Sequence, residues 1–331
     1  MTLDIGVIGL GGLGRVQSTV LDDMDDVRVV GGADVAVAAR EAFEREIAAD
    51  TYEDYNDMIE HHDLDAVAIV TPHELHRDQV EAAFQHDINV HVEKPLVTRS
   101  VDAAELIDMA NERDLVFQVG YQRHFDPAYR EIRRLIGDGE IGEVHMVSCY
   151  LGQAWTDSAA GTWRMDPELS GGGQLIDSGS HLLDVLLWTT DTEPAVVTAL
   201  TDNRGHDVDV DSAVAARLVG EDGRSVTASI GVTGEGAGFT EHLAIWGTAG
   251  RVTYGADGFH VEREGRPSAI LEPGGMDYRE GNRRKLAGFL EAVRTGTEPP
   301  VPASFGLHVT QLTEAAYRAA ERGEVIDVDE L

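Results

Sequence analysis

The first 122 residues alternate apolar runs with amphipathic segments in a regular order. Five apolar runs of strand length, each bounded by turn residues or proline, predict buried strands at 5–10, 27–34, 64–72, 88–95 and 115–122. Segments with apolar residues at helical spacing lie between them and predict helices at 13–24, 35–47, 74–87 and 100–114, the last with Ser100 as its N-cap. Strands separated by helices of this length predict a parallel sheet with helices on both faces.

After residue 122 the pattern changes. A helix is expected at 126–139 and a strand at 142–152, followed by a loop and a short helix that extend to about Trp188. Strand-like runs separated by turn residues then fill residues 194 to about 262 and predict an antiparallel sheet. Two helices, at 282–296 and 305–323, close the chain. The fold class is therefore α/β, with an N-terminal nucleotide-binding type of domain (1–122) and an α+β domain (123–331) built on an open, mainly antiparallel sheet.

Length and charge narrow the possible functions. A chain of 331 residues suits two domains. Its 60 acidic residues against 26 basic ones give a net charge of −34, which repels nucleic acid and anionic membranes, so neither is expected as a partner. No apolar stretch approaches the ~18 residues of a membrane span, and the chain enters a strand pattern at once, so no signal peptide is expected. Cys149 is the only cysteine, which excludes an intrachain disulfide and favours a cytoplasmic location.

Lysine is nearly absent from this chain. Only Lys94 and Lys285 occur, and the other basic residues are arginine. Acidic excess without lysine favours the hypothesis of a protein from a salt-accumulating halophile, and the alternative is an acidic protein from a mesophile. A lysine kept at 94, at the end of a predicted strand, indicates a chemical role, because a permanently charged, planar guanidinium is a poor substitute for a single-point contact. Lys285, beside Arg283 and Arg284 in a predicted helix, suggests no such role.

A glycine motif follows the first predicted strand and opens the first predicted helix. Gly9 permits a tight turn, Gly11 and Gly12 let the backbone approach a pyrophosphate at Leu13, and Gly14 allows close packing of helix on strand. Asp34 ends the second strand, where an acid bonds the adenosine ribose hydroxyls, which favours NAD over NADP. NADP is not excluded, because Arg40 lies close enough in sequence to approach. The alternative is a glycine turn in an unrelated α/β protein.

Two further segments end predicted strands at the same carboxyl edge of the sheet. Thr71 and Pro72 end the third strand, and His73 and His76 follow them. A metal site at the two histidines is not expected, because no acidic or cysteine cluster completes it, and packing at the helix start is the more common role. Glu93 and Lys94 end the fourth strand and are expected to project into the same crevice.

The segment 170–184 combines three glycines with a regularly spaced acidic and histidine set. Asp177, His181 and Asp184 are four and three residues apart, so they share one face of a helix, and an acid one turn from a histidine can orient the imidazole. Gly171, Gly172 and Gly173 allow the backbone to approach a ligand closely. The alternative is a helix start with an ordinary surface histidine and aspartate.

Taken together, these motifs resemble the glucose-fructose oxidoreductase, inositol dehydrogenase and rhizopine catabolism (Gfo/Idh/MocA) family. GVIGLGGLG, TPHELH, HVEKP, GYQRHFDP and WRMDPELSGGGQLIDSGSHLLD occur in the family's order over essentially the whole chain, and the Glu-Lys-Pro and Gly-Gly-Gly…Asp-x-x-x-His segments are the most specific. The resemblance implies a Rossmann domain, then a domain whose open sheet often serves for homo-oligomerisation. It also implies reversible hydride transfer between a sugar or polyol carbinol and NAD(P).

The resemblance also implies roles for single residues. Lys94 matches the family lysine that contacts cofactor and substrate, and Asp177 and His181 match the substrate-binding acid and the general acid/base. Thr71 and Pro72, with His76 and Glu93 beside them, would lie near the nicotinamide ribose. The residues that would contact the substrate, besides Asp177 and His181, are Tyr121, Arg123, Trp163 and Arg164. His73 and His124 depart from the family pattern, so neither receives a role.

Two other functions are compatible with the same motifs. One is NAD-dependent glycoside hydrolysis or dehydration, in which oxidation is transient. The other is a non-catalytic ligand-sensing protein on the same fold, which would be expected to lose Lys94, Asp177 and His181, all of which are present.

Overall fold

The computed structural model describes residues 2–236 and 238–331. The chain forms two compact units. The first unit comprises Met1–Gln122 and Asp277–Leu307, and the second comprises Arg123–Met276 and His308–Leu331. The change of pattern after residue 122 predicts one second domain over 123–331, whereas the segment Asp277–Leu307 belongs with the first compact unit.

The first unit is built on a six-stranded sheet in which all neighbours are parallel, in the order β3-β2-β1-β4-β5-β6. The expected parallel sheet is therefore confirmed, with one strand more than expected. Its strands are β1 (Leu3–Ile8), β2 (Val27–Ala33), β3 (Asp50–Tyr52), β4 (Ala66–Ile69), β5 (Asn89–Val92) and β6 (Phe117–Val119). The additional strand, β3, has only three residues, none of them fully buried, so it gave no apolar run to detect.

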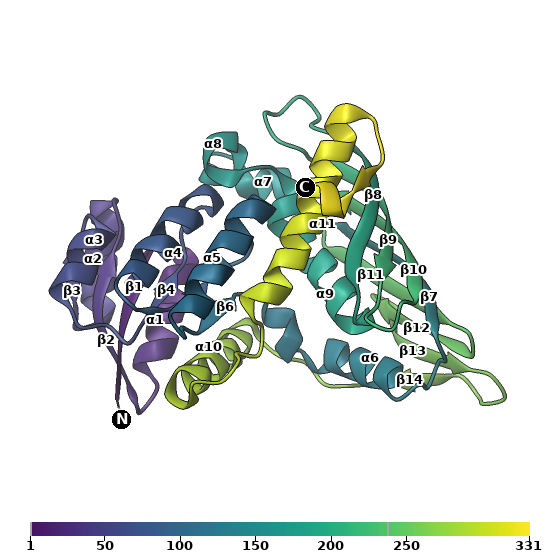
Figure 1. Cartoon of the computed structure of the whole chain (residues 1–331), viewed down its shortest axis with the longest axis horizontal. Coiled ribbons are helices and arrows are strands. Elements are labelled where there is room, and N and C mark those ends of the chain that lie inside the picture. Colours follow the sequence, from purple (N-terminus) through teal and green to yellow (C-terminus); the bar gives the residue numbers. More distant parts are fainter. Residues whose placement is uncertain (1, 237) are drawn as a thin grey trace. The chain divides into compact units, whose positions relative to one another are not determined.

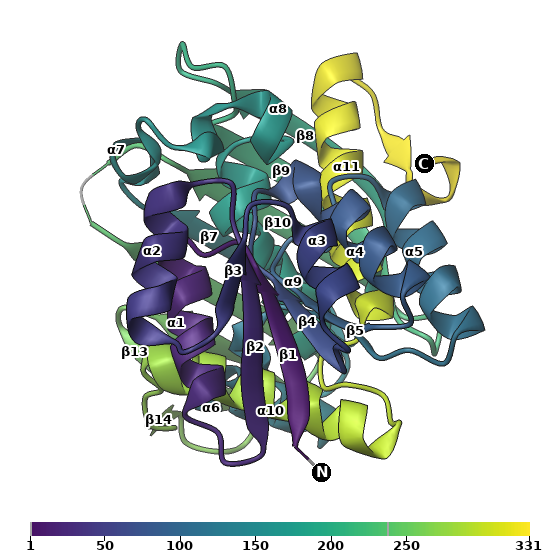
Figure 2. The same ribbon diagram turned by 90° about the vertical axis from the view of Figure 1, so that its left-hand side faces the viewer.

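Helices cover both faces of this sheet. Figure 2 shows α1 and α2 on one side and α3, α4 and α5 on the other. The helices of this unit are α1 (Gly12–Asp22), α2 (Val37–Glu46), α3 (Tyr55–His61), α4 (His76–Gln85), α5 (Ser100–Glu112) and α10 (Tyr278–Thr295). Helix α10 packs against α1, and its Leu286, Phe289 and Leu290 belong to the same buried core cluster as Val7 and Val20. The N-cap of α5 is Arg99 rather than Ser100, which is the first helical residue.

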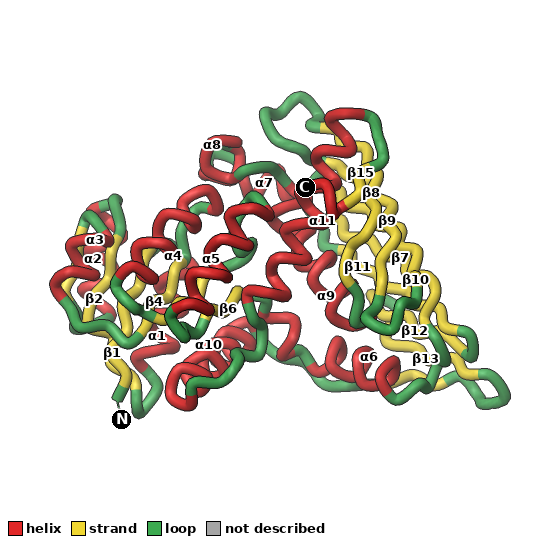
Figure 3. The backbone as a smooth tube through the Cα atoms, in the orientation of Figure 1, coloured by secondary structure: helices red, strands yellow, loops and turns green. Residues whose placement is uncertain are grey.

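The second unit is built on a nine-stranded sheet in the order β14-β13-β12-β11-β7-β10-β9-β8-β15. The strands are β7 (Val144–Gly152), β8 (Glu193–Asp202), β9 (Asp211–Val219), β10 (Ser225–Thr233), β11 (Thr240–Gly247), β12 (Gly250–Gly255), β13 (Gly258–Arg263), β14 (Ala269–Leu271) and β15 (Ile326–Asp327). Neighbouring strands are antiparallel except β7 and β10, which run parallel. The mainly antiparallel sheet that the turn-punctuated pattern predicted is confirmed, and it is visible in Figures 1 and 3.

Helices accompany this sheet along one of its faces. They are α6 (Pro127–Gly137), α7 (Trp155–Ala159), α8 (Pro167–Ser170), α9 (Ser180–Thr190) and α11 (Ala303–Arg322), the last of which starts in the first unit. Helix α9 packs on β7 and on α6. Across the described part of the chain, no helix combines the length and the apolar character that crossing a bilayer requires.

Candidate active site

The glycine motif forms a turn between β1 and α1 that a side chain would obstruct at two positions. Gly9 has φ of +90°, and a Cβ there would lie 2.5 Å from the carbonyl oxygen of Val70. A Cβ on Gly14 would lie 1.9 Å from the carbonyl oxygen of Gly9, so only glycine lets α1 start this close to the strand. At Gly11 and Gly12, by contrast, a Cβ would meet nothing within 4 Å, so the backbone faces open space on that side.

The start of α1 has the properties of an anion site. No side chain caps the helix, its first turn holds no acidic residue, and Leu13 is only partly buried. The free N–H groups and the helix dipole therefore face the open side of Gly11 and Gly12. This geometry fits the pyrophosphate of a dinucleotide.

Asp34, directly after β2, holds the glycine turn in addition to any role toward a ribose. One carboxylate oxygen accepts the N–H of Leu10 and the other accepts the N–H of Ala36, each at 2.8 Å. Arg40 donates to the backbone carbonyl of Asp34 at 2.6 Å and lies 3.5 Å from Glu53. Arg40, which the sequence placed close enough to approach the cofactor, thus lies beside Asp34, and its guanidinium already contacts the Asp34 carbonyl and Glu53.

His76 links the ends of β4 and β5. It is fully buried, with Nδ1 2.9 Å from the carbonyl oxygen of Pro95 and Nε2 3.1 Å from that of Thr71. Burial lowers the pKa of His76 more than these carbonyls raise it. The structure therefore gives His76 the packing role between the two strand ends, and it leaves no exposed ring to contact a cofactor. The Thr71 hydroxyl donates to the Gln79 side chain at 2.5 Å, and this bond fixes the segment that follows β4.

At the end of β5, Glu93 and Lys94 have different surroundings, although both were expected to project into one crevice. Lys94 is partly exposed, and its peptide bond to Pro95 is cis. Glu93 is 5% exposed, so the expectation that it projects into a crevice is wrong. Its carboxylate instead forms an ion pair with the fully buried Lys285 of α10. Tyr121 is also fully buried and offers no surface to a ligand, contrary to its expected place in a substrate pocket.

In the second unit, Asp177 lies in a π-helical turn (Leu175–Gly179) that runs directly into α9. The regular α-helical spacing expected for Asp177 and His181 is therefore wrong, because the turn between them is wider. Such π-helical turns occur frequently at functional sites. The Asp177 carboxylate accepts Trp155 Nε1–H at 2.8 Å and Arg164 Nε–H at 3.0 Å, and only 6% of the residue is exposed.

Arg164 and Trp163 lie next to this carboxylate on a short 3₁₀ turn. The Arg164 side chain is 39% exposed, and its guanidinium lies 4.5 Å from the centre of the Trp163 ring. The Asp177 carboxylate is buried, whereas the Arg164 guanidinium beside it is partly exposed and lies against the Trp163 indole. A guanidinium and an indole next to a carboxylate form a suitable set for binding hydroxyl groups and a sugar face. The structure thus places Arg164 in contact with both Asp177 and Trp163, and the contact of all three with a substrate stays a prediction.

The glycine segment before Asp177 is held by a residue that the sequence did not reveal. Asp209, from the β8–β9 connection, accepts the N–H of Gly173 at 2.6 Å and of Leu175 at 2.9 Å, as well as the hydroxyl of Tyr317 at 2.7 Å. The Tyr317 oxygen in turn accepts the N–H of Ile176 at 3.2 Å. Burial and the charge of Asp209 raise the pKa of Tyr317 well above its ordinary value, so the phenol stays protonated and donates.

Arg123 is engaged by protein groups rather than exposed to a substrate. Its guanidinium donates to both carboxylate oxygens of Glu241, at 2.7 and 2.6 Å, and lies 3.5 Å from the backbone carbonyl of His181. Tyr129 also contacts Glu241. Despite burial, these oxygens raise the pKa of Arg123. Arg123 therefore has the position of a support for the start of α9, not of a free substrate contact.

Asp184 was expected to share a face with His181 but pairs elsewhere. Its Oδ1 lies 2.6 Å from Nε2 of His124, and the His124 ring stacks on Trp188 with 4.2 Å between ring centres. Both residues of the pair are buried. Burial raises the pKa of Asp184 although His124 and Arg123 act in the opposite direction.

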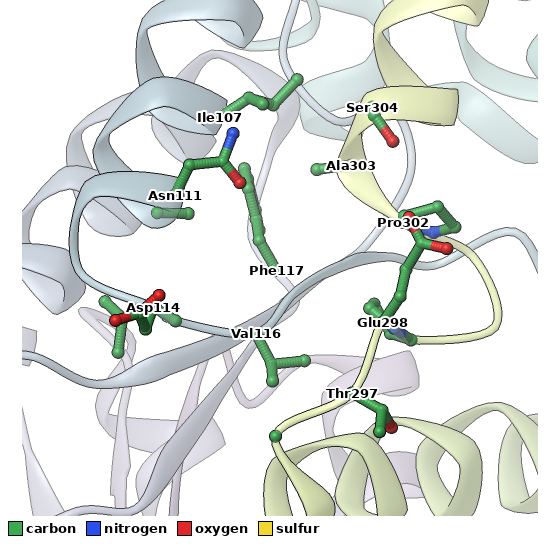
Figure 4. A pocket seen from close by; sticks show the side chains of 14 residues that line it. Ile107, Asn111, Asp114, Val116, Phe117, Thr297, Glu298, Pro302, Ala303 and Ser304 are labelled. Atoms are coloured by element: carbon green, nitrogen blue, oxygen red, sulfur yellow. The ribbon is translucent and has the colours of Figure 1, made fainter.

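A separate hollow of about 440 Å³ lies in the first unit, at the start of β6 (Figure 4). It is lined by α5, β6 and the segment between them, and by the segment between α10 and α11 with the first residues of α11. Its polar residues Asn111, Asp114, Glu298 and Ser304 are exposed, and it lies at the amino end of the strands, away from the glycine turn. Among the described residues no group of three or more histidine, cysteine, aspartate or glutamate side chains is arranged to hold a metal ion.

Comparisons with known proteins agree with this geometry. A model described as "Oxidoreductase family, NAD-binding Rossmann fold" matches residues 3–121, and one described as "GFO/IDH/MocA C-terminal domain" matches residues 129–253. A dTDP-3,4-didehydro-2,6-dideoxy-alpha-D-glucose 3-reductase of Streptomyces violaceoruber is 30% identical over 277 residues, which are 78% of this chain and 77% of the relative. A D-xylose 1-dehydrogenase [NADP(+)] of Haloarcula marismortui is 28% identical over 326 residues, which are 95% of this chain and 86% of that protein.

A solved structure shows the same fold over the full length. Levoglucosan dehydrogenase, in complex with NADH and levoglucosan, superposes with a TM-score of 0.87 at 20% identity and covers 99% of this chain and 100% of its own. With both domain models and a relative at 30% identity in agreement, the chain belongs to the Gfo/Idh/MocA family of oxidoreductases and has an N-terminal NAD(P)-binding Rossmann fold.

Proposed function

We propose that this protein is a dehydrogenase that oxidises a carbinol of a sugar or polyol with NAD(P), in a reversible reaction. The observation that carries the proposal is the glycine turn, which presents uncapped N–H groups and an open backbone at Gly11 and Gly12. The sugar class is supported by the two curated relatives, whose names specify D-xylose and a dTDP-linked deoxyglucose. Bound NAD(P)⁺ would supply the hydride acceptor.

In this proposal the second unit handles the substrate hydroxyl. His181 accepts the hydroxyl proton as the C–H hydride leaves the same carbon, so the alcohol becomes a carbonyl and one proton passes to the imidazole. Asp177, with Trp163 and Arg164 beside it, binds neighbouring hydroxyls. Lys94 stabilises the negative charge that develops on the oxygen while the proton leaves.

The choice of cofactor and the assembly are further parts of the proposal. We infer a preference for NAD, because Asp34 places a carboxylate after β2 and Arg40 is occupied by Glu53 and the Asp34 carbonyl. We also infer a homo-oligomer formed through the open sheet, where Met146, Tyr150 and Ile270 are exposed by 40%, 50% and 70%. Finally, we infer from the charge of −34 and the two lysines that the protein works in concentrated salt.

The test is the absorbance of reduced cofactor after NAD⁺ or NADP⁺ is mixed with a panel of aldoses, inositols and sugar acids. Wild-type protein should reduce the cofactor with at least one of them. The variants His181→Asn and Lys94→Met should each lower kcat by about 10²–10⁴-fold, the usual contribution of a positioned proton-transfer group. Near wild-type turnover in both variants would overturn the residue assignment, and no reduction with any member of the panel would overturn the substrate class.

A further inference from the structure

The two lysines of this chain meet at one glutamate. Lys285, in the middle of α10, is fully buried, and its Nζ contacts Oε1 of Glu93, which is 5% exposed. The other carboxylate oxygen of Glu93, Oε2, accepts the backbone N–H of Lys94 at 3.3 Å. A single carboxylate thus joins the buried lysine of α10 to the main chain of the lysine at the end of β5.

The rest of the surroundings hold this carboxylate in one place. Gln17 of α1 donates its side-chain N–H to Oε1 of Glu93 at 2.5 Å. A Cβ on Gly120, just after β6, would lie 2.8 Å from the carboxyl carbon, so glycine at this position leaves the space that the carboxylate occupies. The backbone N–H of Glu93 bonds to the carbonyl of Ile69 at the end of β4. The carboxylate is therefore packed between α1, α10 and the ends of two strands.

The charge of Lys285 is needed to keep Glu93 ionised. Burial by itself would raise the pKa of Glu93, but the positive charge of Lys285 and the nearby imidazole of His91 hold it well below the usual range. His91 lies 3.8 Å away, and burial lowers its own pKa; His76, on α4, also feels the charge of Glu93. Removing one partner of a buried ion pair leaves the other uncompensated, so Glu93 without Lys285 would take up a proton or move.

We propose that Lys285 is a positioning residue for Lys94: its ammonium group holds the Glu93 carboxylate against the Lys94 N–H and so fixes the strand end from which the Lys94 side chain emerges. This inference rests on the proposed catalytic role of Lys94. It also gives Gln17 a part, because the same carboxylate ties α1, which begins at the glycine turn, to the end of β5. If the Glu93–Lys285 pair only stabilised the core, replacing Lys285 would change neither the environment of the Lys94 amide nor its titration.

The scarcity of lysine makes a direct measurement possible. With ¹⁵N-lysine labelling, the wild-type protein should give two backbone amide signals, since the chain holds only Lys94 and Lys285. In the variant Lys285→Met, Lys94 is the only remaining lysine, so the spectrum contains a single signal, that of the Lys94 amide. We expect that signal to move and to titrate as Glu93 binds a proton, whereas in the wild type, where the pKa of Glu93 is depressed, it should stay constant through the neutral and mildly acidic range.

Matched variants separate positioning from general damage. Arg284→Met removes the neighbouring charge on α10, whose ion pair with Glu280 is 46% and 41% exposed, and it should change neither the Lys94 signal nor kcat. Lys285→Arg keeps the charge and should recover part of the wild-type signal position. If Lys285→Met does not fold, the double variant Glu93→Gln/Lys285→Met, which buries no unpaired charge, serves in its place, and there the Lys94 signal should be displaced without titrating.

Kinetics provide the second readout. Lys285→Met should lower kcat by roughly tenfold to a hundredfold, because a displacement of about 1 Å of a catalytic group can cost ~10²-fold. In a Lys94→Met background the same change should have no further effect, since the two residues act in series. An unmoved, non-titrating Lys94 signal, or an equal loss of kcat in both backgrounds, would overturn the positioning role. Wild-type turnover in Lys94→Met alone would overturn the proposed catalytic role of Lys94 instead, and the amide signal would still decide whether Lys285 holds Lys94.

Discussion

The replacement Asp209→Asn tests how the second unit holds the segment that carries Asp177. The Asp209 carboxylate accepts four hydrogen bonds: Oδ1 from Gly173 N–H and the Tyr317 hydroxyl, and Oδ2 from Leu175 N–H and, at 3.3 Å, the hydroxyl of Ser212. An asparagine can accept at only one of these two positions. At the other position the asparagine NH₂ group, itself a donor, would face the N–H and the hydroxyl that now donate to the carboxylate oxygen there.

The size of the effect follows from these bonds. Bonds to a charged acceptor contribute about 1.5–3 kcal/mol each, and a buried N–H left without an acceptor costs about 1–3 kcal/mol. Asp209→Asn should therefore lower the free energy of unfolding by about 2–4 kcal/mol. Because Leu175 is two residues from Asp177, kcat should fall as well, measured with the substrate that the proposed panel identifies. Ser212→Ala removes only the 3.3 Å bond to the same carboxylate and should cost about 0.5–1.5 kcal/mol with little effect on kcat.

The assay is denaturant unfolding at fixed high salt, followed by far-UV circular dichroism, with kcat measured on the same preparations. Tyr317→Phe gives an intermediate case, because it removes the bond to Asp209 and leaves the N–H of Ile176 without its partner. If Asp209→Asn and Ser212→Ala were equally stable and equally active, Asp209 would not be what holds the glycine segment.

Three further predictions concern the first unit and the charge of the whole chain. Gly11→Ala should fold normally, since its Cβ meets nothing within 4 Å, but fluorescence titration should show weaker binding of NADH. Gly14→Ala should fail to fold stably, because its Cβ would lie 1.9 Å from the Gly9 carbonyl oxygen. Equal affinity for NADH in Gly11→Ala and wild type would contradict the cofactor site at the glycine turn. Asp34→Ala should weaken binding of both NAD and NADP, because it releases the N–H groups of Leu10 and Ala36, and a clean switch to NADP would show that the carboxylate acts on the ribose alone. Raising KCl from millimolar to molar concentrations should increase Tm, since salt screens the repulsion of a net charge of −34, and an unchanged or lower Tm would argue against adaptation to salt.

The sequence was most informative where periodicity or a motif imposes the structure locally. The parallel sheet and the glycine turn are local features, and both were predicted from the pattern. Trp163 and Arg164 were expected near Asp177 only because of the family resemblance. The partners of buried polar groups were not predicted, because Lys285 and Glu93 are 192 residues apart, and Arg123 and Glu241 are 118 apart. No spacing rule connects residues at such separations.

The scarcity of lysine also pointed to Lys285, but the residues beside it suggested an exposed position. The same scarcity of lysine that singled out Lys94 applied equally to Lys285, and the two arginines beside Lys285 made it look like part of a charged helix surface. The Arg284 side chain is 46% exposed, whereas the adjacent Lys285 is fully buried. The π-helical turn at Asp177 was likewise invisible, because a single extra residue per turn leaves the polar and apolar pattern of so short a segment almost unchanged.

The return of the chain to the first unit at Asp277–Leu307 determines how this protein can be divided. A fragment ending at Gln122 would contain every strand of the parallel sheet, yet it would lack α10 and with it the Lys285 ammonium that pairs with Glu93. Such a fragment should be insoluble or unfolded alone and should be rescued by a separate peptide spanning 277–307, in the manner of fragment complementation. We therefore expect that dividing the chain between its two matched domains yields no independent nucleotide-binding module. Exchange of this domain between relatives would then need α10 together with the first 122 residues.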